Sequence, residues 1–109
     1  MRMRLPNRRR SEVIEVKHTE TNGSKTPYVL TAGFYEDDRV GEVFIDAPKA
    51  DSTLGIICHD SAVLISIALQ HGATVKEMQA SVARTKLKGG LPQSVIGTVL
   101  DVLARVEKE

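Results

Sequence analysis

The stretch Ala50–His71, ADSTLGIICHDSAVLISIALQH, is the longest apolar-rich run in the chain, and the rest of the fold is expected to form around it. Asp51 or Ser52 places a short side-chain oxygen where it can accept from the first free N–H groups of a helix. Gly72 follows at the position where a left-handed residue usually closes a helix. The stretch is therefore predicted to be a helix with a defined start and end.

Apolar residues of this helix recur at spacings of three and four, which places them in one stripe along its surface. The stripe consists of Leu54, Ile57, Cys58, Ser61, Leu64, Ile65, Ala68 and Leu69. Val63 and Ile67 widen the stripe beyond one face. We therefore expect the helix to be covered on more than one side.

The bulk composition favours one globular domain. The chain has 109 residues, of which 41% are hydrophobic and 27% charged, as is ordinary for a soluble protein. Because Cys58 is the only cysteine, no internal disulfide can form, which favours a cytoplasmic location. Polar residues interrupt the apolar runs before the roughly 20 residues that a membrane span needs. No membrane partner is expected, and no secretory signal, because the charged N-terminus lacks a following apolar stretch.

Charge is distributed unevenly along the chain. Residues 1–10 contain five arginines and no acid, whereas residues 11–109 contain ten Lys and Arg against fourteen Asp and Glu. We therefore divide the chain into a basic arm, expected to be extended or disordered, and a single domain over residues 11–109. Such an arm can bind nucleic acid, or it can be a solubilising tail, or it can fold back on the acidic body. The candidate nucleic-acid-binding residues are Arg2, Arg4, Arg8, Arg9 and Arg10.

Three segments in the first half of the chain are predicted to be strands. Thr19–Pro27 between the first two is rich in turn formers, and its Asn-Gly pair is typical of a hairpin because both residues tolerate positive φ. Short polar turns between consecutive strands favour an antiparallel meander. The predicted strands are Ser11–His18, Tyr28–Tyr35 and Arg39–Asp46.

Period-two alternation predicts which side of each strand is buried. Ile14 and Val16 share one face of the first strand. In the third strand, Val40 and Phe44 are expected on one side and Val43 and Ile45 on the other. The second strand is expected to present one face made of Tyr28, Leu30, Ala32 and Phe34.

Two further helices are predicted after Gly72. Thr74 and Glu77 have the spacing of a capping box, which predicts a second helix that ends near Arg84. A third helix is predicted over residues 93–108, with Val95, Ile96, Val99, Leu100, Val102, Leu103 and Val106 on a broad apolar face. The predicted fold class is α+β: a three-stranded antiparallel meander followed by three helices packed on one face of the sheet.

The loop before the third helix is a candidate anion or nucleotide site. It places two lysines and two glycines just ahead of a helix N-terminus, where free N–H groups favour an anion. The Gly-Lys-Ser/Thr order of a P-loop is missing. The alternative is an ordinary flexible connector that carries lysines for solubility. The candidate residues are Lys86, Lys88, Gly89, Gly90 and Ser94.

Cys58, His59 and Asp60 are metal-ligand and nucleophile types, but their arrangement does not favour either role. Neighbouring side chains on a helix point about 100° apart, so the three cannot face one ion. A zinc site would need further ligands, and only His18 and His71 remain. Cys58 falls on the predicted core stripe, where an inert thiol is usual. We expect no catalytic residues, no metal and no cofactor.

Four segments together resemble a known family. They are Leu5-Pro6-Asn7-Arg8-Arg9, Gly41-Glu42-Val43-Phe44-Ile45, Ala68-Leu69-Gln70-His71-Gly72, and Pro92-Gln93-Ser94-Val95-Ile96-Gly97 followed by Leu100-Asp101. The chain is similar to small stand-alone bacterial proteins related to the TSCPD domain, which occurs at the C-terminus of adenosylcobalamin-dependent ribonucleotide reductases. The resemblance covers roughly residues 28–83. It implies an accessory domain without the reductase's radical chemistry, which needs several cysteines.

These observations favour a non-enzymatic accessory or assembly module, with nucleotides as a candidate ligand. A homodimer is expected, because three helices with broad apolar faces and one small sheet cannot all be buried inside one short chain. The alternative is an electrostatic nucleic-acid-binding protein that uses the N-terminal arginines and the loop Lys86–Gly90.

Overall fold

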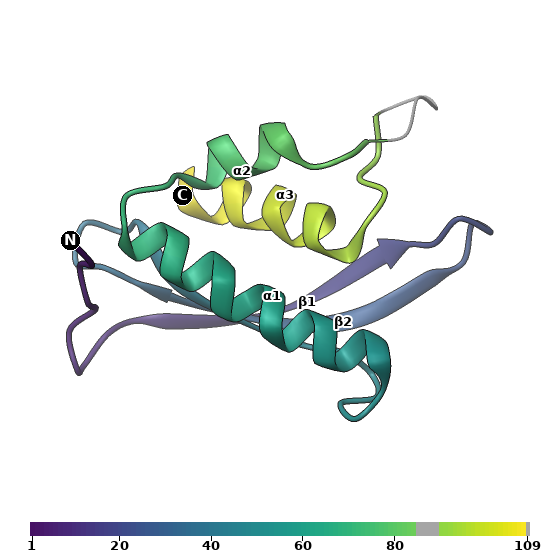
Figure 1. Cartoon of the computed structure of the whole chain (residues 1–109), viewed down its shortest axis with the longest axis horizontal. Coiled ribbons are helices and arrows are strands. Elements are labelled where there is room, and N and C mark those ends of the chain that lie inside the picture. The colour runs from purple at the N-terminus through teal and green to yellow at the C-terminus, as the bar shows by residue number, and fades with distance from the viewer. Residues whose placement is uncertain (85–89, 109) are drawn as a thin grey trace.

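The computed structural model has a three-stranded antiparallel sheet with all three helices on one side of it (Figure 1). The structure describes residues 1–84 and 90–108. The arrangement confirms the predicted α+β class and the meander. The elements are β1 (Ser11–Thr19), β2 (Lys25–Phe34), β3 (Val40–Asp46), α1 (Thr53–Gln70), α2 (Val75–Ser81) and α3 (Val95–Lys108).

The first hairpin is tighter than predicted. β1 continues to Thr19 and β2 begins at Lys25, so the turn is residues 20–24 rather than 19–27. Pro27 therefore lies inside a strand, opposite Lys17. β3 pairs with β2 only from Val29 onward, so this end of β2 has a neighbour on one side alone. Proline is tolerated in such a position because it interrupts no second ladder.

The alternation of hydrogen-bonded and non-hydrogen-bonded pairs between β1 and β2 also explains why a proline is tolerated at position 27. The N–H of Phe34 donates to the carbonyl of Arg10 at 2.9 Å, and the register places these residues directly opposite one another. Hydrogen-bonded and non-hydrogen-bonded pairs alternate in an antiparallel ladder. The even-numbered residues of β1 therefore bond to β2, whereas Pro27 and Lys17 form a non-hydrogen-bonded pair. Pro27 therefore removes no hydrogen bond from the β1–β2 ladder, although it has no N–H group.

The core lies between the sheet and the helices. The inward residues of β2 are buried as predicted, and Val16 of β1 lies beside them. In β3, Val43 and Ile45 are buried while Phe44 is 53% exposed on the open face. Val40 was expected to share the side of Phe44 but is buried. The reason is a β-bulge beside Phe34, which shifts the register by one residue before Val40.

The helix α1 starts as predicted, because the Oγ of Ser52 accepts from the N–H of Gly55 at 3.0 Å. Its buried face is rotated away from the predicted stripe, however. The stripe members Leu54, Ile57 and Leu64 are 44%, 53% and 67% exposed. Only one side of α1 is covered within the single chain, and that side consists of Gly55, Cys58, Ala62, Ile65, Leu69 and Gln70.

The first half of the buried side of α1 consists of small residues. A Cβ atom on Gly55 would lie 2.4 Å from the carbonyl oxygen of Lys49, so the chain leading into the helix passes directly over that glycine. Cys58 and Ala62 follow on the same face and are nearly fully buried. The buried side of α1 thus begins with small residues and includes Leu69 near its end, whereas Ile57 and Leu64 point outward.

The two C-terminal helices pack on one another over the β1 side of the sheet (Figure 1). The capping box of α2 is confirmed: Thr74 and Glu77 each accept from the other's N–H, at 3.0 and 2.9 Å. α2 ends at Ser81, before the predicted Arg84. The predicted apolar face of α3 is confirmed, because it buries Val95, Val99, Leu100 and Leu103 and partly buries Ile96, Val102 and Val106.

Candidate functional site

The predicted anion loop lies mainly outside the described residues, which exclude Lys86, Lys88 and Gly89. The other two members already have structural partners. The carbonyl of Gly90 accepts from Nη1 of Arg84 at 3.1 Å. The Oγ of Ser94 accepts from the N–H of Gly97 at 3.1 Å, which caps the start of α3. An anion site at this loop stays a prediction.

The basic arm lies against the body of the domain. Nε of Arg2 donates to Oε1 of Gln70 at 2.7 Å. Arg9 binds both carboxylate oxygens of Glu42, at 2.6 and 3.1 Å, and this partner holds the pKa of the guanidinium above its ordinary value. Two of the five arginines are thus bound to side chains of α1 and β3.

Arg10 is a third arginine with partners on the body. Its Nη2 lies 2.9 Å from a carboxylate oxygen of Asp38, and its guanidinium lies over the ring of Phe34, 3.9 Å from the centroid. Among the described residues, no ion pair is made by Arg4 or Arg8. Part of the arm's charge is therefore balanced internally. The nucleic-acid role and the division of the chain at residue 10 stay predictions.

Gln70 joins two of the segments that carry the family resemblance, and it also binds the N-terminal arm. It is only 7% exposed, and its Nε2 donates to the carbonyl of Gly41 at 2.9 Å while its Oε1 accepts from Arg2. The N–H of Met3 donates to its main-chain carbonyl at 2.7 Å. The arm, the start of β3 and the end of α1 therefore meet at one buried amide. Sequence reasoning placed Gln70 at a helix end and missed this role.

Ser66 has a related role on the free edge of β3. The N–H of Val43 donates to the Oγ of Ser66 at 2.9 Å, and the hydroxyl of Ser66 donates to the carbonyl of Ala62 at 2.8 Å. Together with the bond from Gln70 to Gly41, this covers the β3 edge with side chains of α1. The signal in the sequence was a polar residue within a long apolar run.

The Cys58-His59-Asp60 trio does not converge. Cys58 is buried in the core, and burial raises the pKa of its thiol. His59 and Asp60 are exposed and contact one another at 3.1 Å. Within residues 1–84 and 90–108, no three His, Cys, Asp or Glu side chains are placed to share a metal ion. His18 lies elsewhere, buried, with Nδ1 2.7 Å from the Oγ1 of Thr98.

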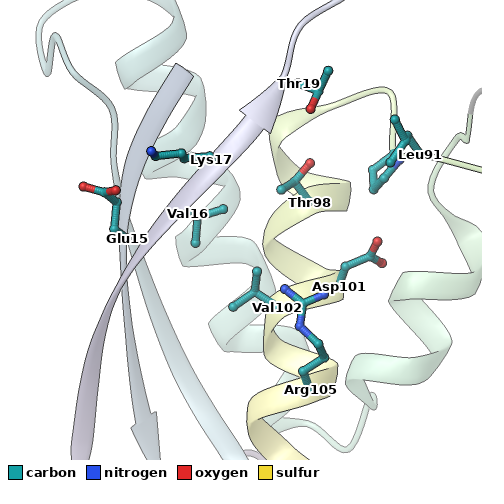
Figure 2. A pocket seen from close by; sticks show the side chains of 10 residues that line it. Glu15, Val16, Lys17, Thr19, Leu91, Thr98, Asp101, Val102 and Arg105 are labelled. Carbon is teal, nitrogen blue, oxygen red and sulfur yellow. The ribbon is translucent and has the colours of Figure 1, made fainter. Parts of the chain in front are cut away.

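A hollow of about 260 Å³ lies between β1 and α3 (Figure 2). Its most polar member, Asp101, is bound by Arg84 at 2.6 and 3.1 Å and by Gln79 at 2.9 Å. The hydrogen bond from Arg84 holds the pKa of the Asp101 carboxyl below its ordinary value. This carboxylate therefore ties α2 and the loop to α3 and is poorly placed to act as a base.

Five exposed large apolar side chains of the described residues lie on α1. We call the surface that they form the α1 outer face, and it consists of Leu54, Ile57, Ser61, Leu64 and Ala68, flanked by Ile56 and Val63. By length and composition alone α1 is apolar enough to cross a membrane, but its opposite side packs on the sheet of a globular domain. Contiguous exposed apolar surface of this kind usually marks an interaction site.

Comparison with known proteins agrees with the resemblance seen in the sequence. The TSCPD domain family matches residues 2–107. Vitamin B12-dependent ribonucleotide reductases from Agrobacterium fabrum and Rhodopirellula baltica are 32% identical over 87 residues, which is 80% of this chain and 6% and 8% of theirs. The corresponding enzyme of Bradyrhizobium diazoefficiens is 32% identical over 76 residues, 70% of this chain and 6% of its own length. No solved structure matches the chain.

Proposed function

Because the chain belongs to the TSCPD domain family, we propose that it is a non-enzymatic accessory module whose task is assembly, and that two copies associate through the α1 outer face. The chain spans only 6–8% of the length of the reductases that it matches, so their reaction is not carried over to it. A non-enzymatic role is supported by the site chemistry: the thiol of Cys58 faces the core, and Asp101 is held by Arg84.

The observation that carries the proposal is the exposure of Leu54, Ile57 and Leu64, at 44%, 53% and 67%. With Ser61 and Ala68 they follow the three- and four-residue spacing of a straight seam on a helix. An antiparallel copy of α1, related by a two-fold axis at Ser61, would place Leu54 against Ala68 and Ile57 against Leu64. The seam is thus complementary to itself. Ser61, a small residue, lies at its centre, and the small residue Ala68 lies opposite Leu54.

A second copy is the simplest occupant because one two-fold contact buries the same surface on both chains. Removing apolar area from water contributes about 25 cal/mol per Å², so several aliphatic side chains on each chain form a substantial driving force. A second copy would also explain why α1 carries apolar residues on both sides. One side serves the core, and the other serves the second copy.

Light scattering of the full chain at micromolar concentration tests this proposal. The parent is expected to be an oligomer, and Leu64→Glu is expected to halve its mass because a charge would be buried in the seam. Leu64 is 67% exposed, so the variant should keep the parent's circular dichroism spectrum. The matched control is His59→Glu, an exposed position on the same helix that points away from Ile57 and Leu64, which should leave the mass unchanged. A monomeric parent, or a Leu64→Glu variant of unchanged mass, would contradict the proposal.

Electrostatic nucleic-acid binding by the arm is the second candidate, supported by Arg4 and Arg8, which have no ion-pair partner among the described residues. Each phosphate contact contributes about 0.7–0.9 to the logarithmic salt slope of binding. The variant Arg4→Ser, Arg8→Ser should lower the slope for an oligonucleotide by about 1.4–1.8. An unchanged slope would reject the role of the arm.

Anion or nucleotide contact at the loop before α3 is a separate proposal, supported by the two lysines and two glycines ahead of the helix. Weak polyanion binding should disappear in the variant Lys86→Ala, Lys88→Ala. Binding equal to that of the parent would show that the loop is an ordinary connector.

A further inference from the structure

We propose that the free edge of β1 pairs with β1 of a second copy, which joins two three-stranded sheets into one continuous sheet across a two-fold axis. This contact is distinct from the α1 seam, because β1 and β3 lie at opposite edges of the sheet and α1 packs on β3. It does not depend on the assembly role proposed above.

The two edges of the sheet differ in whether other parts of the described chain bind their main-chain groups. The β3 edge is covered, because Ser66 accepts from the N–H of Val43 and Gln70 donates to the carbonyl of Gly41. The β1 edge runs over nine residues, and no hydrogen bond from elsewhere in the described chain reaches its main chain. An uncovered edge of this length is a template for another strand.

The main-chain groups available on this edge are fixed by the ladder with β2. The Arg10–Phe34 hydrogen bond places the even-numbered residues of β1 in bonded pairs with β2. The odd-numbered residues therefore turn their N–H and C=O groups toward the free edge. They are Ser11, Val13, Glu15, Lys17 and Thr19.

Charge selects one register for an antiparallel copy. With the two-fold axis at Val16, Glu15 lies opposite Lys17 of the second copy, and Lys17 lies opposite its Glu15. Odd residues then face odd residues, so their N–H and C=O groups can exchange hydrogen bonds. A shift by one pair places Glu15 opposite Glu15, or Lys17 opposite Lys17, and like charges directly opposite are destabilising. The strand is therefore complementary to itself in one register.

The side-chain directions support this arrangement. Val16 points toward α3, whereas Glu15 and Lys17 project to the other side of the strand (Figure 2). On the axis, Val16 is already buried at 2% exposure, so the contact between the two copies would rest on main-chain hydrogen bonds and on the charged pairs. The two charged pairs would lie on the solvent side, where ions need no burial.

Charge reversal tests the proposal on the full chain. Lys17→Glu makes the edge wholly acidic and Glu15→Lys makes it wholly basic, so each variant alone should lose the β1 contact and halve the assembled mass. Both positions are exposed, so folding should be unaffected. An equimolar mixture of the two variants should regain the parent mass, because each acid then faces a lysine. The double variant Glu15→Lys, Lys17→Glu should also assemble as the parent does.

A second readout separates this contact from the α1 seam. In the Leu64→Glu background, the amide hydrogens of Val13, Glu15 and Lys17 should be protected from exchange and should lose that protection on adding Lys17→Glu. Free exchange of these amides at concentrations where the chain is assembled would overturn the proposal and leave the α1 seam standing. Failure of the mixed variants to regain the parent mass would overturn it as well. Recovery together with protection would establish it whatever the fate of the α1 seam.

Discussion

Replacing Ser66 by alanine should destabilise the domain through one buried N–H group. The Oγ of Ser66 accepts from the N–H of Val43 at 2.9 Å, and Val43 is only 2% exposed. Alanine leaves no acceptor at that point, and α1 shields the β3 edge from water. The group would then be buried without a partner.

The magnitude follows from two opposing effects. A buried donor that loses its partner costs about 1–3 kcal/mol. Alanine is a better helix former than serine by about 0.5 kcal/mol, which offsets part of that loss. The control Ser61→Ala gains the same helix propensity, and its hydroxyl makes no hydrogen bond within the described chain. The difference between the two variants therefore isolates the Val43 interaction, at about 1–3 kcal/mol.

Thermal unfolding measures this difference. For a domain of this size about 1 kcal/mol corresponds to about 4–8 °C in Tm, so Ser66→Ala should melt about 4–24 °C below Ser61→Ala. Both should be measured at two protein concentrations, because association shifts apparent stability and Ser61 lies in the proposed seam. If Ser66→Ala melted at or above Ser61→Ala, water or another group would be satisfying the edge, and the reasoning would be wrong.

Three further predictions concern other contacts. Gly55→Ala should lower Tm, because the new Cβ would lie 2.6 Å from the carbonyl oxygen of Ala50. This is the opposite of the usual effect, since alanine ordinarily stabilises a helix by about 1 kcal/mol relative to glycine. A raised Tm would contradict the close approach. Asp101→Asn should lose stability in urea at neutral pH. Because the folded pKa of Asp101 is lowered by Arg84, the pair's contribution is complete above the unfolded pKa of about 4, and the parent should lose this advantage as the pH falls through the folded pKa. The thiol of Cys58 should react with a thiol reagent only as the chain unfolds, because it is 1% exposed and its pKa is raised by burial; rapid labelling of native protein would refute this.

The α1 helix shows where sequence reasoning succeeds and where it stops. Its start at Ser52 could be predicted because a cap acts within a few residues of chain. Its buried face could not, because apolar residues occur on both sides and periodicity then leaves the phase open. Only the tertiary structure shows that Cys58, Ala62 and Ile65 lie on the covered side, while Gly55 lies under the chain that leads into the helix.

The roles of Gln70 and Ser66 could not be predicted from the sequence for a similar reason. Gln70 stood within a segment that resembles the family, but its role depends on Gly41 and Arg2, which are far from it in the chain. Ser66 was a plain polar residue in an apolar run until the edge of β3 was placed beside it. Of the anion loop, only Gly90 and Ser94 lie within the described residues, so its geometry remains to be tested.

By itself the sequence determined the elements, their order and the inward face of β2, because strand alternation, turn residues and helix caps act over short separations along the chain. Only the tertiary structure decided which side of α1 is buried, how the arginine arm meets Glu42 and Gln70, and that β3 is covered at its edge while β1 is not. These features depend on contacts between residues distant in sequence. Such contacts form only when the whole sheet is in place, and no local pattern encodes them.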